Sequence, residues 1–264
     1  MITDIPTNNQ WAKEFFNNSY FCDTVLKKYA ESKEFDGSVS FLIKELNLPR
    51  KNATIFDQCC GTGSYSLEIG KRLQDKSSII FGVDISDHQI SNAESNNLTK
   101  NCCFSIGDAY QYITPMQCDA AYNINSSFGY SDTDEENIKM LQRVYDSLKN
   151  GGKFILEYPN TPYLKDNFIS ILTETYDAKN GKKVQVTWNA RIEDNKLYKD
   201  YSFGSDKEDP VIKCGGGMKL YTPADLKIML SNVGFGDFRI FGNLNGEKFS
   251  ENNSPRYVIS SIKI

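Results

Sequence analysis

The stretch Asp57-Gln-Cys-Cys-Gly-Thr-Gly63 decides the fold of this chain. An apolar run, Ala53 to Phe56, leads into it, and a segment with helical periodicity begins at Ser64. A strand, a tight turn of small residues and a helix N-terminus, in this order, hold nucleotide-like ligands in open α/β sheets. The acid in front of the turn discriminates between ligands, because a fixed negative charge repels a phosphate and attracts a cation.

Two more acids stand where later strands end. Asp84 follows an apolar run, and a carboxylate at this place can accept hydrogen bonds from both hydroxyls of a ribose. Asp108 can accept from an adenine amino group, while Ala109 offers a backbone donor. We expect Asp57 to hold a ligand's ammonium through the backbone of the turn or through water. S-adenosylmethionine, with adenosine at one end and an ammonium and a sulfonium at the other, fits all three acids.

Each acid also has a purely structural reading. Asp57 can interact with the dipole of the following helix, Asp84 can cap the next helix, and Asp108 can belong to a simple turn. The glycines of the first turn allow the backbone to approach a ligand closely. The predicted cofactor-binding residues are Asp57, Cys59, Cys60, Gly61, Thr62, Gly63, Asp84, Ile85, Gly107, Asp108, Ala109 and Asn123.

Strands and helices alternate along most of the chain. The segment Ser78–Asp84 is apolar without alternation, which is typical of a strand in a parallel sheet covered on both faces. We predict strands at 53–59, 78–84, 102–106, 119–125, 153–158, 236–241 and 257–264, and helices at 64–75, 87–97, 133–149 and from Thr222 to Gly234. This pattern predicts an α/β fold with a largely parallel sheet.

Two segments depart from the alternation. The first fifty residues predict two helices, one from Trp11 to Tyr29 and one from Val39 to Leu48, with Gly37 as the break between them. Later, 182–193 and 196–203 predict a hairpin, and 211–221 a third strand. We therefore expect one domain over 1–264, with a helical cap at 1–50 and an antiparallel β insertion at 180–221.

Composition and charge exclude several classes of protein. The net charge is −4 and no Lys/Arg-rich run occurs, which argues against a nucleic-acid partner. No apolar run approaches the roughly 20 residues of a membrane span, and no secretory signal is visible, so we expect a cytoplasmic protein. The seven cysteines form no C-x-x-C pair, and His88 is the only histidine. We expect reduced thiols and no metal site.

A series of motifs resembles the class I S-adenosylmethionine-dependent methyltransferases over roughly residues 35–264. Within that class, the chain resembles bacterial small-molecule methyltransferases in which Ser-Phe-Gly-Tyr follows strand four. The motifs are Asp57–Gly63, Gly82-Val-Asp-Ile-Ser86, Gly107-Asp-Ala109, Ser127-Phe-Gly-Tyr130, Leu148-Lys-Asn-Gly-Gly152 and Val233-Gly-Phe235.

The resemblance implies a Rossmann-like sheet of seven strands in the order 3-2-1-4-5-7-6, with only the seventh antiparallel and with helices on both faces. It also implies a β insertion after strand five that covers the methyl acceptor, which matches the predicted hairpin. One departure concerns Cys59, which stands where the family has glycine. We expect a slightly shifted loop and a narrower pocket for the methionine part of the cofactor.

The acceptor site is harder to read. Methyl transfer is an in-line displacement in which alignment supplies much of the rate, and a base is only sometimes needed. We expect transfer to a nitrogen or oxygen atom of a small molecule, with Glu157 and Tyr130 as candidate catalytic residues. Glu157 can equally be an acid neutralised by Arg191 or a lysine. The predicted substrate-binding residues are Asn125, Tyr130, Tyr158, Arg191, Tyr221 and Arg256.

Three other functions remain open from the sequence. An NAD-dependent oxidoreductase normally has a third glycine where this chain has Ser66. An RNA or other nucleic-acid methyltransferase shares the chemistry, but the Asn/Asp-Pro-Pro-Tyr motif of base-amine enzymes is missing after strand four. A cofactor-binding subunit without catalysis is the third alternative, because of Cys59. For the assembly, we expect a monomer or a homodimer.

Overall fold

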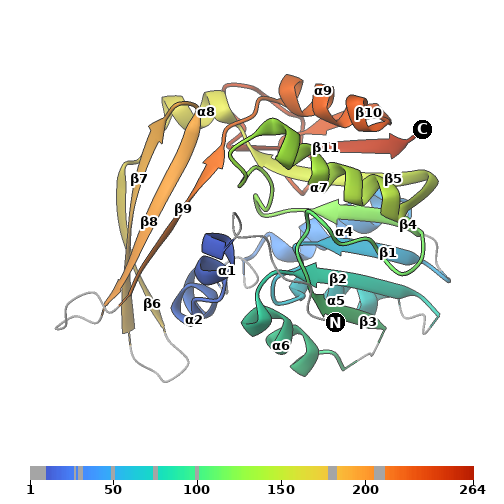
Figure 1. Cartoon of the computed structure of the whole chain (residues 1–264), viewed down its shortest axis with the longest axis horizontal. Helices are drawn as coiled ribbons and strands as arrows, with labels where there is room; N and C mark the ends of the chain where they lie inside the picture. The colour runs from blue at the N-terminus through green and yellow to red at the C-terminus, as the bar shows by residue number, and fades with distance from the viewer. Residues whose placement is uncertain are drawn as a thin grey trace.

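Two β-sheets stand side by side in this protein, as Figure 1 shows. The computed structural model describes residues 10–26, 28, 32–48, 51–73, 77–98, 101–177, 183–204 and 212–264. The large sheet has seven strands in the order β10-β11-β5-β4-β1-β2-β3, and the small sheet has four in the order β6-β7-β8-β9. No helix within the described residues is long and apolar enough to cross a membrane.

The large sheet has the predicted topology. Strands β1 to β5 run parallel, and β11 runs antiparallel to both β5 and β10. In the family's numbering, β10 and β11 are strands six and seven, so the order 3-2-1-4-5-7-6 is confirmed. The strands are β1 (Thr54–Gln58), β2 (Ile79–Asp84), β3 (Cys102–Ile106), β4 (Cys118–Asn123), β5 (Leu148–Pro159), β10 (Phe235–Phe241) and β11 (Arg256–Lys263).

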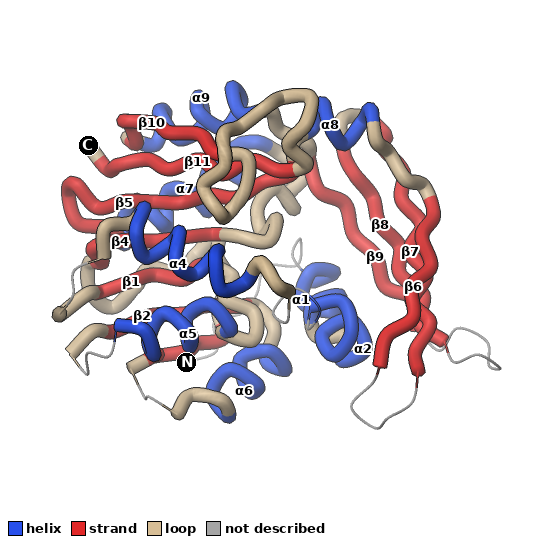
Figure 2. The backbone as a smooth tube through the Cα atoms, turned by 180° about the vertical axis from the view of Figure 1, so that it is seen from behind, coloured by secondary structure: helices blue, strands red, loops and turns tan. Residues whose placement is uncertain are grey.

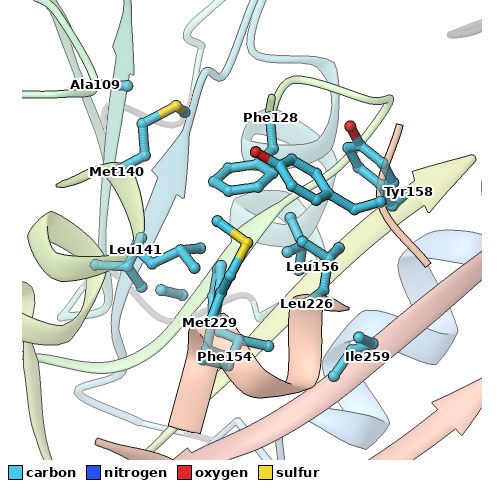
Figure 3. Packing of buried hydrophobic residues seen from close by; sticks show 14 of the residues in the cluster. Ala109, Phe128, Met140, Leu141, Phe154, Leu156, Tyr158, Leu226, Met229 and Ile259 are labelled. Atoms are coloured by element: carbon cyan, nitrogen blue, oxygen red, sulfur yellow. The ribbon is translucent and has the colours of Figure 1, made fainter. Parts of the chain in front are cut away.

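Helices cover both faces of this sheet. On one face, α4 (Phe35–Glu45) and α5 (Ser64–Leu73) contribute Leu42 and Ile69 to a core with Ile55 of β1. On the other face lie α7 (Asp134–Ser147) and α9 (Pro223–Val233). Figure 3 shows Met140 and Leu141 of α7 with Met229 of α9 in that second core. Helix α6 (Asp87–Ser95) packs on β2 and β3.

The boundaries around β5 differ from the prediction. Helix α7 ends at Ser147, two residues before the predicted end, and β5 begins at Leu148 instead of residue 153. Leu148 pairs with Cys118 of β4, so the Gly-Gly segment lies inside the strand. Gly151 has a φ of 76°, a backbone conformation that lets the chain bend there without ending the pairing.

The insertion is larger than predicted. It follows α8 (Thr161–Asp166) and contains β6 (Ile171–Asp177), β7 (Lys183–Glu193), β8 (Lys196–Gly204) and β9 (Ile212–Lys219), all antiparallel. The predicted hairpin corresponds to β7 and β8, and the predicted third strand to β9. Strand β6 was missed, so the sheet starts at Ile171, before the predicted limit of residue 180.

The N-terminal segment also differs from the prediction. The expected first helix is broken into α1 (Gln10–Phe16), α2 (Ser19–Phe21) and the π-helix η2 (Cys22–Leu26), because Asn18 caps α2 by accepting from the Phe21 backbone N–H. Tyr29, the expected end of this helix, lies outside the described residues. Helix α4 includes Gly37, where a Cβ atom would lie 2.6 Å from Asn245 Oδ1. Figures 1 and 2 both show α1 and α2 between the two sheets.

Candidate active site

The turn after β1 has a left-handed backbone at three positions. Cys59, Gly61 and Gly63 have φ values of 64°, 55° and 72°. At Gly63 a Cβ atom would lie 2.6 Å from the Phe104 ring, so glycine is required there. Cys59 adopts the left-handed conformation without being glycine, which costs about 1–2 kcal/mol. The loop therefore keeps the glycine-like geometry despite the cysteine.

Asp84 fixes this turn to the end of β2. Its Oδ2 accepts from the Gly61 backbone N–H at 2.8 Å, and its Oδ1 accepts from the Ser86 N–H at 3.0 Å. Burial raises the pKa of the Asp84 carboxyl, and these backbone hydrogen bonds act in the opposite direction. The carboxylate thus lies at the edge where the turn and β2 meet, and it borders the site from there.

Asp57 points into the protein and not toward the site. Its Oδ2 accepts hydrogen bonds from Ser66 Oγ at 2.6 Å and from the Tyr122 hydroxyl at 3.0 Å. Only 3% of the residue is exposed. Burial raises the pKa of this carboxyl to about 7, against the lowering effect of the two hydrogen bonds. Asp57 therefore connects β1 to α5 and β4 by hydrogen bonds. It can affect ligand binding only indirectly, through the positions of these elements.

Two adjoining hollows lie at the carboxyl ends of the parallel strands. They share Phe16, Cys59, Asp84, Ser127 and Tyr130. The first has about 560 Å³ of space between atoms, part of which is open to solvent. Its other lining residues are Ala12, Ile85, Gly107, Asp108, Ala109, Tyr110 and Met140. The second is also lined by Leu26, Cys60, Gly61, Thr62, Ser64, Tyr65, Gln89 and Asn125.

Most predicted cofactor residues come together in these hollows, and three do not. Asp57, Gly63 and Asn123 line neither. Asn123 is fully buried and donates from Nδ2 to Gln58 Oε1 at 3.0 Å. Sequence reasoning missed Ala12 and Phe16, because nothing in their local pattern links α1 to the end of the sheet. It also missed Tyr110 and Met140, although Tyr110 directly follows the predicted Gly107-Asp-Ala109 turn.

Glu157 is held by Arg256, and neither Arg191 nor any lysine of the described residues pairs with it. Arg256 Nε donates to Glu157 Oε1 at 2.7 Å, and Glu157 Oε2 accepts from the Asn125 backbone N–H at 2.7 Å. Arg256 Nη2 also donates to Ser126 Oγ. Asn125 and Ser126 both have left-handed φ values, 59° and 60°. With both oxygens occupied, Glu157 positions this strained turn after β4.

Four predicted substrate residues do not line the two hollows, and Arg256, which donates to Glu157, is one of them. The Tyr158 hydroxyl is buried and donates to the Lys219 carbonyl. The Tyr221 hydroxyl donates to Asp134 Oδ1, which joins the insertion to α7. Arg191 is exposed, pairs with Asp200 at 3.1 Å and stacks on Tyr198. Of the predicted substrate residues, Asn125 and Tyr130 line the hollows.

A third hollow opens between the N-terminal segment and the insertion sheet. Its walls are Val25, Lys28 and 32–34 on one side, and Leu172, Glu174, Tyr176, Trp188, Lys199 and Tyr201 on the other.

Across the described parts of the chain, no group of three His, Cys, Asp or Glu side chains could hold a metal ion. Six of the seven cysteines are free thiols, and the side chain of Cys214 lies outside the description.

The sequence profile of the family described as "Methyltransferase domain" matches residues 49–216. The chain belongs to this family. It is of the class I type that uses S-adenosylmethionine, as the motifs and the sheet order indicate.

The methyltransferase has curated relatives at low identity. It is 30% identical over 128 residues to a ubiquinone/menaquinone biosynthesis C-methyltransferase of Rickettsia akari, covering 45% of this chain and 50% of the relative. It is 23% identical over 180 residues to an mRNA cap guanine-N(7) methyltransferase of Meyerozyma guilliermondii, covering 52% and 30%. The methyltransferase thus spans half or less of the length of these curated relatives.

Solved structures show the same fold over nearly the whole methyltransferase. A S-adenosylmethionine-dependent methyltransferase of Clostridium acetobutylicum has a TM-score of 0.73 at 18% identity, covering 90% of this chain and 96% of that one. The sugar N-methyltransferase KedS8 of a Streptoalloteichus species has a TM-score of 0.68 at 14% identity, covering 90% and 92%. At these identities the likeness establishes the fold alone.

Proposed function

We propose that this protein transfers the methyl group of S-adenosylmethionine to a nitrogen or oxygen atom of a small molecule. One observation carries the proposal: Asp84, Asp108 and the Cys59–Thr62 turn border two adjoining hollows at the carboxyl ends of the strands. Ligands of open α/β sheets bind at this edge. The two hollows have different lining residues, so each end of the cofactor would meet its own set of protein groups.

The two hollows suit the two halves of the cofactor. In the first, the Asp84 carboxylate would accept from the ribose hydroxyls, and Asp108 with the Ala109 backbone would face the adenine. In the second, the backbone of Gly61 and Thr62 would face the methionine part. Cys59 stands between the halves, because it borders both hollows.

When bound, the cofactor would supply an electrophilic methyl on a sulfonium, and its S–C bond would break with the electron pair passing to sulfur. The residues of the chain align the acceptor's lone pair with that bond and exclude water. The turn after β4 presents Asn125 and Ser127 at this place, and Tyr130 borders both hollows. Glu157 and Arg256 hold this turn in its left-handed conformation. Tyr130 is the candidate that can contact the reacting atoms.

The charge of the chain and the small sheet support a small acceptor over a nucleic acid. The net charge is −4, whereas nucleic-acid enzymes need a basic surface. The insertion sheet stands opposite the cofactor edge with the N-terminal helices between, which limits the room for a polymer. The sugar N-methyltransferase KedS8, named for a small-molecule acceptor, shares the fold over 90% of this chain. Free thiols at six cysteines support a cytoplasmic location as part of the same proposal.

Calorimetry with purified protein tests the cofactor site. We expect S-adenosylmethionine and its demethylated product to bind with micromolar-range affinity, and NAD to leave no signal. Replacing Asp84 by Ala removes charge-assisted hydrogen bonds and should weaken binding by about 1–3 kcal/mol. Asp166→Ala, a change at an exposed acid of α8, is the matched control and should bind like the wild type. Binding of NAD in place of the sulfonium cofactor would refute the proposal.

A further inference from the structure

Lys199 lies on the face of β8 whose other side chains pack in the interior of the protein. Side chains alternate between the two faces of a strand, so Leu197, Lys199, Tyr201 and Phe203 share one face. Leu197 and Phe203 are 6% and 0% exposed, which identifies this face as the inner one. Lys199 is thus a cation in a row of inward-facing apolar residues, and it lines the third hollow.

The ammonium of Lys199 has no counterion in the described structure. No carboxylate among the described residues forms an ion pair with it, in contrast to Lys196 and Lys219, which pair with Asp132 and Asp134. The Lys199 ammonium lies over the Trp188 ring, 4.7 Å from the ring centroid. Burial lowers the pKa of Lys199, and the positive charge of Arg256 lowers it further. A partly buried cation without a partner is unfavourable, and an anionic ligand would relieve it.

The sheet leaves space around Lys199. In the strand register its neighbours are Ala190 on β7 and Gly216 on β9, two of the smallest residues. The hollow offers three aromatic residues as walls for the body of a ligand, Tyr176, Trp188 and Tyr201. Its charged lining residues are Lys28, Lys33, Glu34, Glu174 and Lys199, and Lys28 is paired with Glu174 at 2.8 Å.

The hollow at Lys199 is linked to the cofactor edge. Arg256, which acts electrostatically on Lys199, donates to Ser126 in the turn after β4. The neighbouring residues Asn125 and Ser127 line the second cofactor hollow. On the opposite wall, consecutive residues of η2 face the two spaces, Val25 the third hollow and Leu26 the second. The third hollow and the second cofactor hollow therefore share η2 as a wall.

We propose that the third hollow binds the methyl acceptor and that this acceptor carries a carboxylate or phosphate group, which lies against Lys199. The inference rests on the proposed function, because it names the substrate class of that site. The apolar or aromatic body of the acceptor packs on Trp188 and Tyr201, and its nucleophilic atom faces the turn after β4.

Trp188 provides a direct probe of this site. The chain has two tryptophans, Trp11 and Trp188, so a Trp11→Phe variant reports on the hollow alone. We would titrate it with benzoate, phenyl phosphate and the neutral benzyl alcohol, and follow the fluorescence. Both anions should bind at least about tenfold more tightly than the alcohol, a preference worth about 1.4 kcal/mol. The anion that binds more tightly shows whether the acceptor carries a carboxylate or a phosphate.

Variants of Lys199 decide whether this residue is responsible. In the Trp11→Phe background, Lys199→Met should remove the preference for anions, and Lys199→Arg should retain it. Lys196→Met, a change on the same strand at a lysine paired with Asp132, is the matched control and should also retain it. Equal binding of benzoate and benzyl alcohol, or an anion preference that survives Lys199→Met, would overturn the inference.

A separate measurement keeps the two proposals distinct. The demethylated cofactor should bind Lys199→Met and wild type alike in calorimetry, because Lys199 lines neither cofactor hollow. If the cofactor does not bind the wild type, the proposed function fails, whatever the fluorescence titration gives. If the cofactor binds and the anions show no preference, only the inference about the acceptor fails.

Discussion

The three acids at the strand ends look alike in the sequence and differ in the structure. Asp84 and Asp108 border the cofactor hollow, whereas Asp57 faces Ser66 and Tyr122 inside the protein. The sequence predicted their place at one edge of the sheet, because that follows from the order of strands and turns. It could not predict the direction of the Asp57 side chain, because Tyr122 lies on another strand and meets Asp57 only after folding.

The left-handed backbone at Cys59 leads to a stability prediction. Both Cys59→Gly and Cys59→Ala remove the thiol, but only glycine relieves the strain at a φ of 64°. We expect Cys59→Gly to exceed Cys59→Ala in free energy of unfolding by about 1 kcal/mol. Urea denaturation followed by circular dichroism measures the difference.

Cys103 offers the matched comparison for Cys59. It lies in β3, is exposed and is not among the residues with positive φ. There the alanine variant should be the more stable of the pair, because glycine weakens a strand. Equal stability of the two Cys59 variants would show that this position carries no backbone strain.

The buried Asp57 carboxyl leads to a pH prediction. Its folded-state pKa of about 7 lies above the unfolded-state value of about 3.9, so between these values the folded protein binds more protons. The free energy of unfolding therefore falls as the pH rises through this window. Asp57→Asn removes this titration, so we expect the variant to gain stability relative to wild type as the pH rises from about 4 to about 7.

Urea denaturation across that pH range measures the difference between the two proteins. Asp84, whose pKa burial also raises, is present in both proteins. Asp166→Asn, at an exposed acid, should track the wild type at every pH. A difference between Asp57→Asn and wild type that does not change with pH would contradict the prediction.

Elements with strong periodicity were predicted well, and those shaped by distant contacts were not. Strand β6 reads Ile-Leu-Thr-Glu-Thr-Tyr-Asp, with few apolar residues, because only one side of it is half-buried. Its pairing with β7 across the start of the insertion defines it as a strand. The break between α1 and α2 depends on Asn18 as a cap, a signal that the apolar spacing of the segment concealed.

The position of helix α1 leads to a prediction about cofactor affinity. Phe16 borders both cofactor hollows, and its ring packs edge-on against Tyr130 with the centroids 5.7 Å apart. Phe16→Ala should weaken binding of the demethylated cofactor about tenfold, because it removes apolar cover from the ligand. Calorimetry measures this loss.

Phe41 serves as the control for Phe16. It packs on Phe241 at 5.1 Å and lines neither cofactor hollow, so Phe41→Ala should leave the affinity unchanged. Unaltered binding by a folded Phe16→Ala variant would show that α1 does not cover the ligand.

At the scale of the whole molecule, the alternation of strands and helices predicted an α/β fold, and the family resemblance implied the order of the seven strands. The residues of the site at the edge of this sheet were predicted only in part. The residues that close it from outside, Ala12 and Phe16, come from a segment far from the motifs. Their place depends on how the N-terminal helices fill the space between two sheets, which local spacing does not encode.

The position of α1 and α2 has one more consequence. Phe16 faces the nucleotide edge, and its neighbour Phe15 packs on Tyr201 of the small sheet with ring centroids 5.7 Å apart. This short stretch thus packs on the small sheet with one ring and borders the hollows of the large sheet with the next. A shift of Phe15 and Phe16 would therefore alter the packing on the small sheet and the border of the hollows at the same time.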